Sequence, residues 1–197
     1  VRIKKGLYEI ADLGSLGSLT LSRYVVAGLL LTDSYVSDEN ALQYHGQHDQ
    51  LMRSVLSVAR TRHAPIDVHG TTYHYTRVQE DFFFGFDEVQ LDGQIARIAQ
   101  VEKALIDMIQ LRRSDYAVDR VGEVLTTEGA VDLERLNAYL RQSALPTQRI
   151  FGFLLETLNL PVDERLVALA HSSQSVTRLT QASTVRDARW RLYYDPD

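Results

Sequence analysis

The sequence predicts an α+β fold, in which a small mixed or antiparallel sheet with packed helices is followed by a helical C-terminal half. Between residues 52 and 99, segments rich in β-branched and aromatic residues are separated by turn signals, of which the dipeptide Asp92-Gly93 is the strongest. From Val101, apolar side chains recur at helical spacing until two arginines end the series at Arg113. Beyond Arg113, helical periodicity replaces the strand signals.

Composition excludes several classes of protein. The 197 residues are 45% hydrophobic and 24% charged, as in ordinary globular chains, and the absence of cysteine excludes disulfides, thiolate zinc sites and cysteine nucleophiles. The longest apolar run, residues 24–31, is far shorter than the roughly 20 residues of a spanning helix. No apolar segment typical of a signal peptide follows the first residues, so we expect a cytoplasmic protein. The net charge of −5 disfavours DNA binding by the whole surface.

Three regions follow from the pattern along the chain. We expect a strand and linker in residues 1–19, an α+β domain in residues 20–113, and a helical subdomain with a final strand in residues 114–197. The first ten residues are basic and alternating, like the end of a β-hairpin. Two Gly-Ser-Leu steps follow, which suit either a flexible joint or a loop with packed leucines.

Helix signals open the α+β domain. Residues 21–31 suit a buried helix with Thr20 as its N-cap. A second helix is predicted over residues 38–45, with Ser37 as its N-cap and Gly46 at the C′ position that favours glycine. If Ser37 is a cap, replacing it by alanine costs about 1 kcal/mol.

Strand signals and then helical stripes fill the rest of the chain. Strands are expected at residues 52–60, 66–68, 72–78, 89–91 and 94–99. The aromatic segment 82–86 is either a core plug or an exposed contact patch, and the core plug is the preferred interpretation. Leucine-rich stripes predict helices around residues 133–140, 150–158 and 166–170. Residues 190–194 are predicted to form a final strand that returns to the sheet.

Few residue patterns point to catalysis. The chain has no Gly-x-Ser-x-Gly elbow and no phosphate-binding glycine loop, and its histidines do not match metal-ligand spacing, so we expect no cofactor and no metal. Glu102, Lys103 and Asp107 invite an interpretation as a metal-dependent nuclease, because such enzymes combine acidic residues with a lysine. Glu102 and Asp107 are five positions apart, however, which separates them by about 140° around a helix.

Arg2, Lys4 and Lys5 form the basic cluster near the start of the sequence. Wing hairpins of winged helices present such residues to DNA phosphates, so these three are candidate DNA-binding residues. The alternative is a solvated basic end without a partner.

The order of short motifs resembles the AbiEi family of antitoxins and transcriptional regulators. Tyr35-Val36-Ser37, then Ala41-Leu42 and His45-Gly46, is similar to the signature YIS…AL…HG of that family. Phe84-Gly85 follows in the expected order. The segment 101–107, VEKALID, is similar to the family's PEKALLD helix with valine in place of proline, and the segment 149–155, RIFGFLL, is similar to its RLGYLLE helix.

The resemblance implies a protein that acts by binding and has no enzymatic activity. Its C-terminal domain would neutralise a nucleotidyltransferase-type toxin, with or without a stable complex. A winged helix-turn-helix, if one precedes residue 1, would bind promoter DNA, and the first residues would be its wing strand. The signature and contact candidates are Tyr35, Ser37, Tyr44, His45, Gly46, Glu102, Lys103 and Asp107. We expect residues 35–46 to be mainly architectural, with Tyr44 and His45 packed between the first helices and the sheet.

Three hypotheses therefore stand. The first is an antitoxin and regulator module that acts by binding rather than catalysis. The second is a DNA-binding autorepressor without antitoxin activity. The third is the metal-dependent nuclease around Glu102, Lys103 and Asp107.

Overall fold

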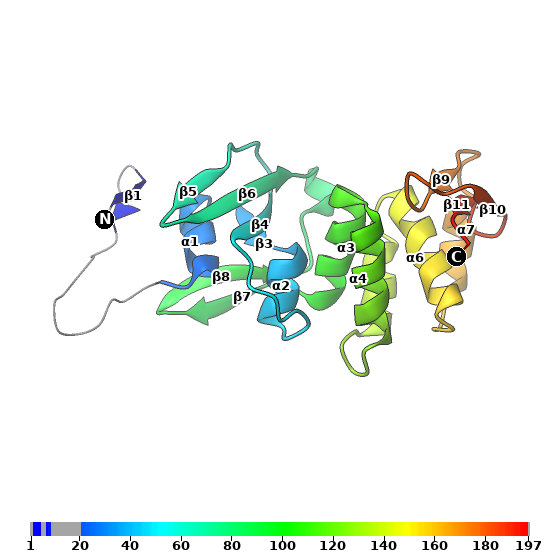
Figure 1. Cartoon of the computed structure of the whole chain (residues 1–197), viewed down its shortest axis with the longest axis horizontal. Coiled ribbons are helices and arrows are strands. Elements are labelled where there is room, and N and C mark those ends of the chain that lie inside the picture. Colours follow the sequence, from blue (N-terminus) through cyan, green and yellow to red (C-terminus); the bar gives the residue numbers. More distant parts are fainter. Residues whose placement is uncertain (1, 5–6, 9–20, 197) are drawn as a thin grey trace.

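The computed structural model describes residues 2–4, 7–8 and 21–196 of the chain. Within these residues it contains seven α-helices, one six-stranded and one three-stranded mixed sheet, and a two-stranded hairpin. The α+β class predicted from the sequence is confirmed. Figure 1 shows the six-stranded sheet on one side of helices α3 and α4, and helices α6 and α7 with the three-stranded sheet on the other.

A short hairpin lies at the N-terminal end. Strands β1 (Arg2–Lys4) and β2 (Leu7–Tyr8) pair in antiparallel fashion. Two of the three candidate DNA-binding residues, Arg2 and Lys4, belong to β1, whereas Lys5 lies outside the described residues. Most of the predicted linker also lies outside them.

The six-stranded sheet has the order β5-β6-β4-β3-β8-β7. Its strands are β3 (Ser34–Val36), β4 (Ser54–Ala59), β5 (Ile66–Val68), β6 (Thr71–Arg77), β7 (Phe86–Leu91) and β8 (Gln94–Ala99). The pairs β4–β6 and β3–β8 are parallel, and the other neighbours are antiparallel. The predicted hairpin at Asp92-Gly93 is confirmed: both residues have positive φ, 52° and 72°, as a type I′ turn requires.

Helices α1 (Arg23–Leu30) and α2 (Asp38–Tyr44) flank the central strand β3. The expectation for α1 is corrected at its start, because the N-cap is Ser22, whose hydroxyl accepts from the amide of Tyr24 at 3.3 Å. Thr20 lies outside the described residues. Helix α1 is fixed to the sheet by Tyr75, which donates to the carbonyl of Ala27 at 2.9 Å.

Helix α2 continues the chain directly from β3. The side chain of Asn40, in α2, accepts from the amide of Leu56 at 2.8 Å and donates to the carbonyl of Ser54 at 3.1 Å. On β4, strand β3 pairs with residues 57–59, so Asn40 satisfies backbone groups of β4 that lie beyond the end of β3. The predicted helix end is confirmed, since Gly46 has a φ of 73°.

Helix α3 (Val101–Arg112) agrees with its predicted bounds and packs against α2, α4, α5 and α6. The helical half contains α4 (Asp115–Thr126), α5 (Leu133–Leu140), α6 (Leu145–Thr157) and α7 (Glu164–Ala170). The stripes predicted for α5, α6 and α7 are confirmed, whereas α4 was not predicted as a separate helix. Ser114 caps α4 by accepting from the amide of Ala117 at 3.2 Å.

The prediction that the final strand returns to the main sheet is wrong. Strand β11 (Leu192–Tyr194) lies instead in a small sheet, antiparallel to β10 (Val185–Asp187) and parallel to β9 (Thr177–Arg178). Trp190 holds this sheet on α6, because it is fully buried and its indole donates to Glu156 at 2.5 Å. In the described residues, no helix combines the length and apolar character needed to cross a membrane.

Candidate functional site

Asp107 of α3 is the centre of a buried polar network with β3. Its Oδ2 accepts from Tyr35 Oη at 3.0 Å and from Ser37 Oγ at 2.7 Å, while Lys103 Nζ lies 2.6 Å from Oδ1. All four side chains are about 1% exposed. The carboxylate is thus paired with a cation and hydrogen-bonded by two hydroxyls, the conditions under which a buried charge is tolerated. The network joins strand β3 to helix α3.

Aromatic rings enclose Lys103. Its ammonium lies 4.6 Å from the ring centroid of Phe84 and 5.9 Å from that of Tyr35. Gly85, with a φ of 76°, brings the backbone against the lysine stem, because a Cβ there would lie 3.0 Å from Lys103 Cβ and 3.1 Å from Tyr139. The aromatic segment therefore acts here as the preferred core plug, although Phe83 is its one buried ring and its other three rings are half-buried.

Tyr35 is a proton donor in this network. Burial raises the pKa of Tyr35 well above its ordinary value, and the negative charge of Asp107 raises it further. Its ring also stacks on Phe86 at 4.8 Å and meets Phe83 edge-on at 5.1 Å. The hydroxyl is therefore neutral under physiological conditions and holds Asp107 in position.

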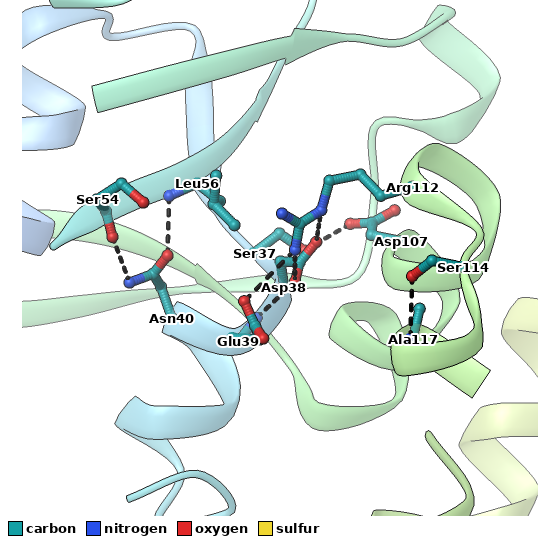
Figure 2. A network of polar contacts seen from close by, with 10 residues as sticks. All are labelled: Ser37, Asp38, Glu39, Asn40, Ser54, Leu56, Asp107, Arg112, Ser114 and Ala117. Atoms are coloured by element: carbon teal, nitrogen blue, oxygen red, sulfur yellow. Dashed lines mark hydrogen bonds and ion pairs between the residues drawn. The ribbon is translucent and has the colours of Figure 1, made fainter. Parts of the chain in front are cut away.

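A second polar cluster lies beside the first, at the start of α2 (Figure 2). Arg112 donates to both carboxylate oxygens of Asp38, at 2.5 and 2.9 Å, and reaches Glu39 at 3.5 Å. Asp38 has a φ of 60°, in the left-handed region that non-glycine residues seldom adopt. The hydrogen bond to Glu39 raises the pKa of Tyr116 to about 12. This cluster ties α2 to the end of α3 and the start of α4.

Replacing Asp38 by asparagine is expected to stabilise the protein at neutral pH. Burial raises the pKa of Asp38, and the lowering effect of Arg112 does not offset it. A raised folded-state pKa means that the folded chain binds the proton more tightly than the unfolded chain, so stability from this group is lost as pH rises through the folded pKa. Asparagine is neutral and tolerates positive φ.

Thermal melts of the two proteins check this expectation. The advantage of Asp38→Asn is expected at neutral pH and should shrink towards about pH 3, where the aspartate is also protonated. An asparagine variant that is less stable than the parent at neutral pH would show that the ion pair with Arg112 outweighs the burial of the carboxylate.

Ser37 occupies the N-cap position of α2, as predicted, but the expected capping hydrogen bond is absent. The Ser37 hydroxyl donates to Asp107 instead. Since the acceptor is a buried carboxylate, we expect Ser37→Ala to cost about 2 kcal/mol rather than the smaller cost of a lost cap. Denaturant unfolding measures this, and Ser114→Ala, which removes a true cap, is the matched control at about 1 kcal/mol. Equal costs for the two variants would contradict the role given to the Asp107 contact.

Glu102 faces away from Asp107, as the spacing on the helix predicts. Its carboxylate accepts from the amide of Asp132 at 2.7 Å and lies 3.5 Å from Arg135, at the start of α5. The structure therefore brings Lys103 and Asp107 together but not Glu102 and Asp107. Within the described part of the chain, no three His, Asp or Glu side chains gather closely enough to hold a metal ion.

The remaining signature residues lie at the end of α2. His45 Nε2 is 2.8 Å from the carbonyl of Ala99, which fixes α2 to the end of β8. Tyr44 packs edge-on against Tyr24 of α1 with 6.0 Å between ring centroids, and 37% of its surface stays exposed. His45 thus makes a contact of the kind expected for an architectural residue, whereas Tyr44 combines packing with an accessible face.

Sequence reasoning assigned no buried contact to two polar residues. Arg149 of α6 is 1% exposed, and its guanidinium donates to the carbonyls of Ala170 and Ser173 at 2.8 to 3.0 Å. The position of Arg149 next to the apolar stripe of α6 could have indicated that its side chain is buried. The contacts of Asn40 with β4 could not be predicted from the local sequence, because its partners lie 14 and 16 residues away.

No protein-family model matches the chain, and a search of curated proteins gave no match. The resemblance to the AbiEi family therefore rests on the motif residues themselves.

Proposed function

We propose that the chain is an antitoxin and transcriptional-regulator module of the AbiEi type, which neutralises a nucleotidyltransferase-type toxin by binding rather than by catalysis. The observation that carries the proposal is the convergence of two separate motifs on one carboxylate. Tyr35 and Ser37 come from the first motif, Lys103 and Asp107 from the second, and they form one buried network.

The other motifs join the same core. Gly85 lies against the stem of Lys103, and α6, which carries Arg149 and Gly152 of the last motif, packs on α3. Motifs that are far apart in the sequence thus serve one scaffold. This convergence supports taking the motifs together as one pattern.

Burial of the network supports binding rather than catalysis. A catalytic group must contact its substrate, whereas Lys103 and Asp107 are about 1% exposed and their polar atoms are already paired. Their role in the proposal is to hold β3 against α3. The partner would then contact the exterior that this scaffold supports, and the module would act in the cytoplasm together with its toxin.

Co-expression with the adjacently encoded toxin tests the proposal. Residues 1–197 are expected to restore growth of cells that express the toxin. His45→Ala serves as a second arm, with a thermal melt of the purified variant beside the growth assay. Loss of folding together with loss of rescue fits the architectural role of His45, whereas loss of rescue by a folded variant would assign it to the contact surface. A folded, soluble parent chain that fails to restore growth would refute the antitoxin function.

Promoter DNA is the second candidate partner, and the hairpin β1–β2 is the observation that favours it. Arg2 and Lys4 lie on this hairpin, as the basic residues of a wing do. A mobility-shift titration with the chain's own promoter would show retardation that weakens steeply with salt and is reduced in Lys4→Ala. Arg62→Ala, an exposed arginine far along the chain, is the control. Absence of retardation at low salt would remove this candidate for residues 1–197.

A further inference from the structure

A groove separates helix α4 from the C-terminal segment. It has a volume of about 400 Å³ and is lined by Asp115, Val118 and Asp119 on one side and by Leu179, Ala182 and Asp195 on the other. This volume lies within the range of sites that hold a ligand or a partner's side chain. Beside the groove, the side chain of Arg113, in the α3–α4 connection, donates to the backbone carbonyl of Arg178 at 3.1 Å. This hydrogen bond joins the start of α4 to the C-terminal segment.

The lining of the groove is apolar in part and strongly acidic in part. The buried Leu179 and the half-buried Val118 supply apolar atoms to the lining. Asp115 and Asp119 are one helical turn apart on α4, which places both carboxylates on the same face, and Asp195 lies across from them. A ligand here would meet hydrocarbon and three negative charges together.

The three carboxylates have no partner within the part of the chain that is described. Elsewhere in these residues acidic side chains are commonly paired, as Asp163 is with Arg141 at 2.5 Å and Asp38 is with Arg112. Arg113 and Arg178 lie beside the groove but form no ion pair with these carboxylates among the described residues, so the three charges repel one another and favour a negative potential in the groove. That potential repels the phosphates of nucleic acids and attracts a cation.

We infer that this groove docks an arginine or lysine side chain of a protein partner. A long basic side chain matches both parts of the lining, since its methylene stem covers apolar surface while its charged head reaches the carboxylates. The inference rests on the proposed function, and the partner is the toxin that the module neutralises. Arginine is also among the residues that dominate the energetics of protein interfaces.

The double variant Asp115→Asn/Asp119→Asn tests the groove. Asp49→Asn/Asp81→Asn is its matched control, because those two carboxylates are exposed, unpaired in the described residues and outside the groove, and their loss changes the net charge equally. Affinity for the purified toxin is measured by calorimetry, and rescue of growth is scored in parallel. The groove variant is expected to bind about tenfold more weakly or worse and to lose rescue, while the control stays close to the parent.

Salt provides a further readout. The parent's affinity is expected to fall as ionic strength rises, and the groove variant should show a flatter dependence because two of the charges are gone. Circular dichroism melts establish that both variants fold, and Asp195→Asn, on the opposite wall, replaces the double variant if it does not.

The outcomes separate the two proposals. A parent chain that neither binds the toxin nor rescues growth overturns the proposed function, and the groove inference falls with it. A parent that binds, with a folded groove variant that binds equally well, overturns the groove inference alone. Weaker binding of the control and the groove variant to the same extent also overturns it, since general charge would then explain the loss.

Discussion

Alanine at position 152 is expected to destabilise the protein by about 3 kcal/mol or more. Gly152 lies in α6 beneath the indole of Trp190, and a Cβ there would be 2.0 Å from its Cζ3 atom. Trp190 cannot withdraw without loss, because it is fully buried and hydrogen-bonded to Glu156. The added methyl group therefore separates the three-stranded sheet from α6 or leaves the ring in collision. Denaturant unfolding, followed by tryptophan fluorescence, measures the effect.

Gly122→Ala is the control for this experiment. Gly122 lies inside α4, and a Cβ at that position would meet no atom within 4 Å. Alanine is the better helix former, so this variant is expected to gain up to about 1 kcal/mol. The same chemical change thus has opposite signs at two helical glycines. A Gly152→Ala protein that unfolds at the parent's midpoint would contradict the packing of Trp190 on α6.

Replacing Asp107 by asparagine is expected to cost about 4 kcal/mol. The ammonium of Lys103 stays buried without its counter-charge, and the hydroxyls of Tyr35 and Ser37 face an amide in place of a carboxylate. An uncompensated buried charge is among the most damaging changes in a protein interior. The exposed ion pair of Arg97 with Glu88 is the comparison, for which Glu88→Gln should cost less than about 1 kcal/mol.

A double variant distinguishes the loss of the Lys103–Asp107 ion pair from the cost of leaving Lys103 buried without a counter-charge. In Lys103→Met/Asp107→Leu both ionic groups are gone, so the protein is expected to be more stable than Asp107→Asn alone. Chemical denaturation of the parent, Lys103→Met, Asp107→Leu and the double variant gives the coupling energy. If Asp107→Asn costs no more than Glu88→Gln, the network does not hold β3 to α3.

Local patterns predicted much of the fold because their causes are local. The Asp92-Gly93 turn depends on the tolerance of two residues for positive φ, and α3 depends on apolar spacing within one segment. The opposite directions of Glu102 and Asp107 also followed from helix geometry alone. Helix α4 could have been found in the same way, since Ala117, Val121 and Val124 are buried at helical spacing.

The site was less predictable because its partners are distant in sequence. Tyr35 and Ser37 meet Asp107 across 72 and 70 residues, and neither spacing nor composition reports such a contact. Ser37 shows the physical reason clearly. A serine before a helix can donate to a remote carboxylate instead of capping the helix, and only the fold decides between the two. The prediction for the final strand was wrong for the same reason, since the residue pattern predicts a strand but not the strand with which it pairs.

Because Lys103 is buried, chemical modification of its amine can report when the protein core opens. Only three lysines occur in the sequence, two of them at positions 4 and 5, and Lys103 is 1% exposed. Acylating reagents modify free amines, so position 103 reacts only when α3 leaves β3. The rate at which that single amide forms, followed by peptide mass spectrometry, gives the frequency of core opening in the free protein. A bound partner that stabilises the fold would slow it, without any probe being attached to the chain.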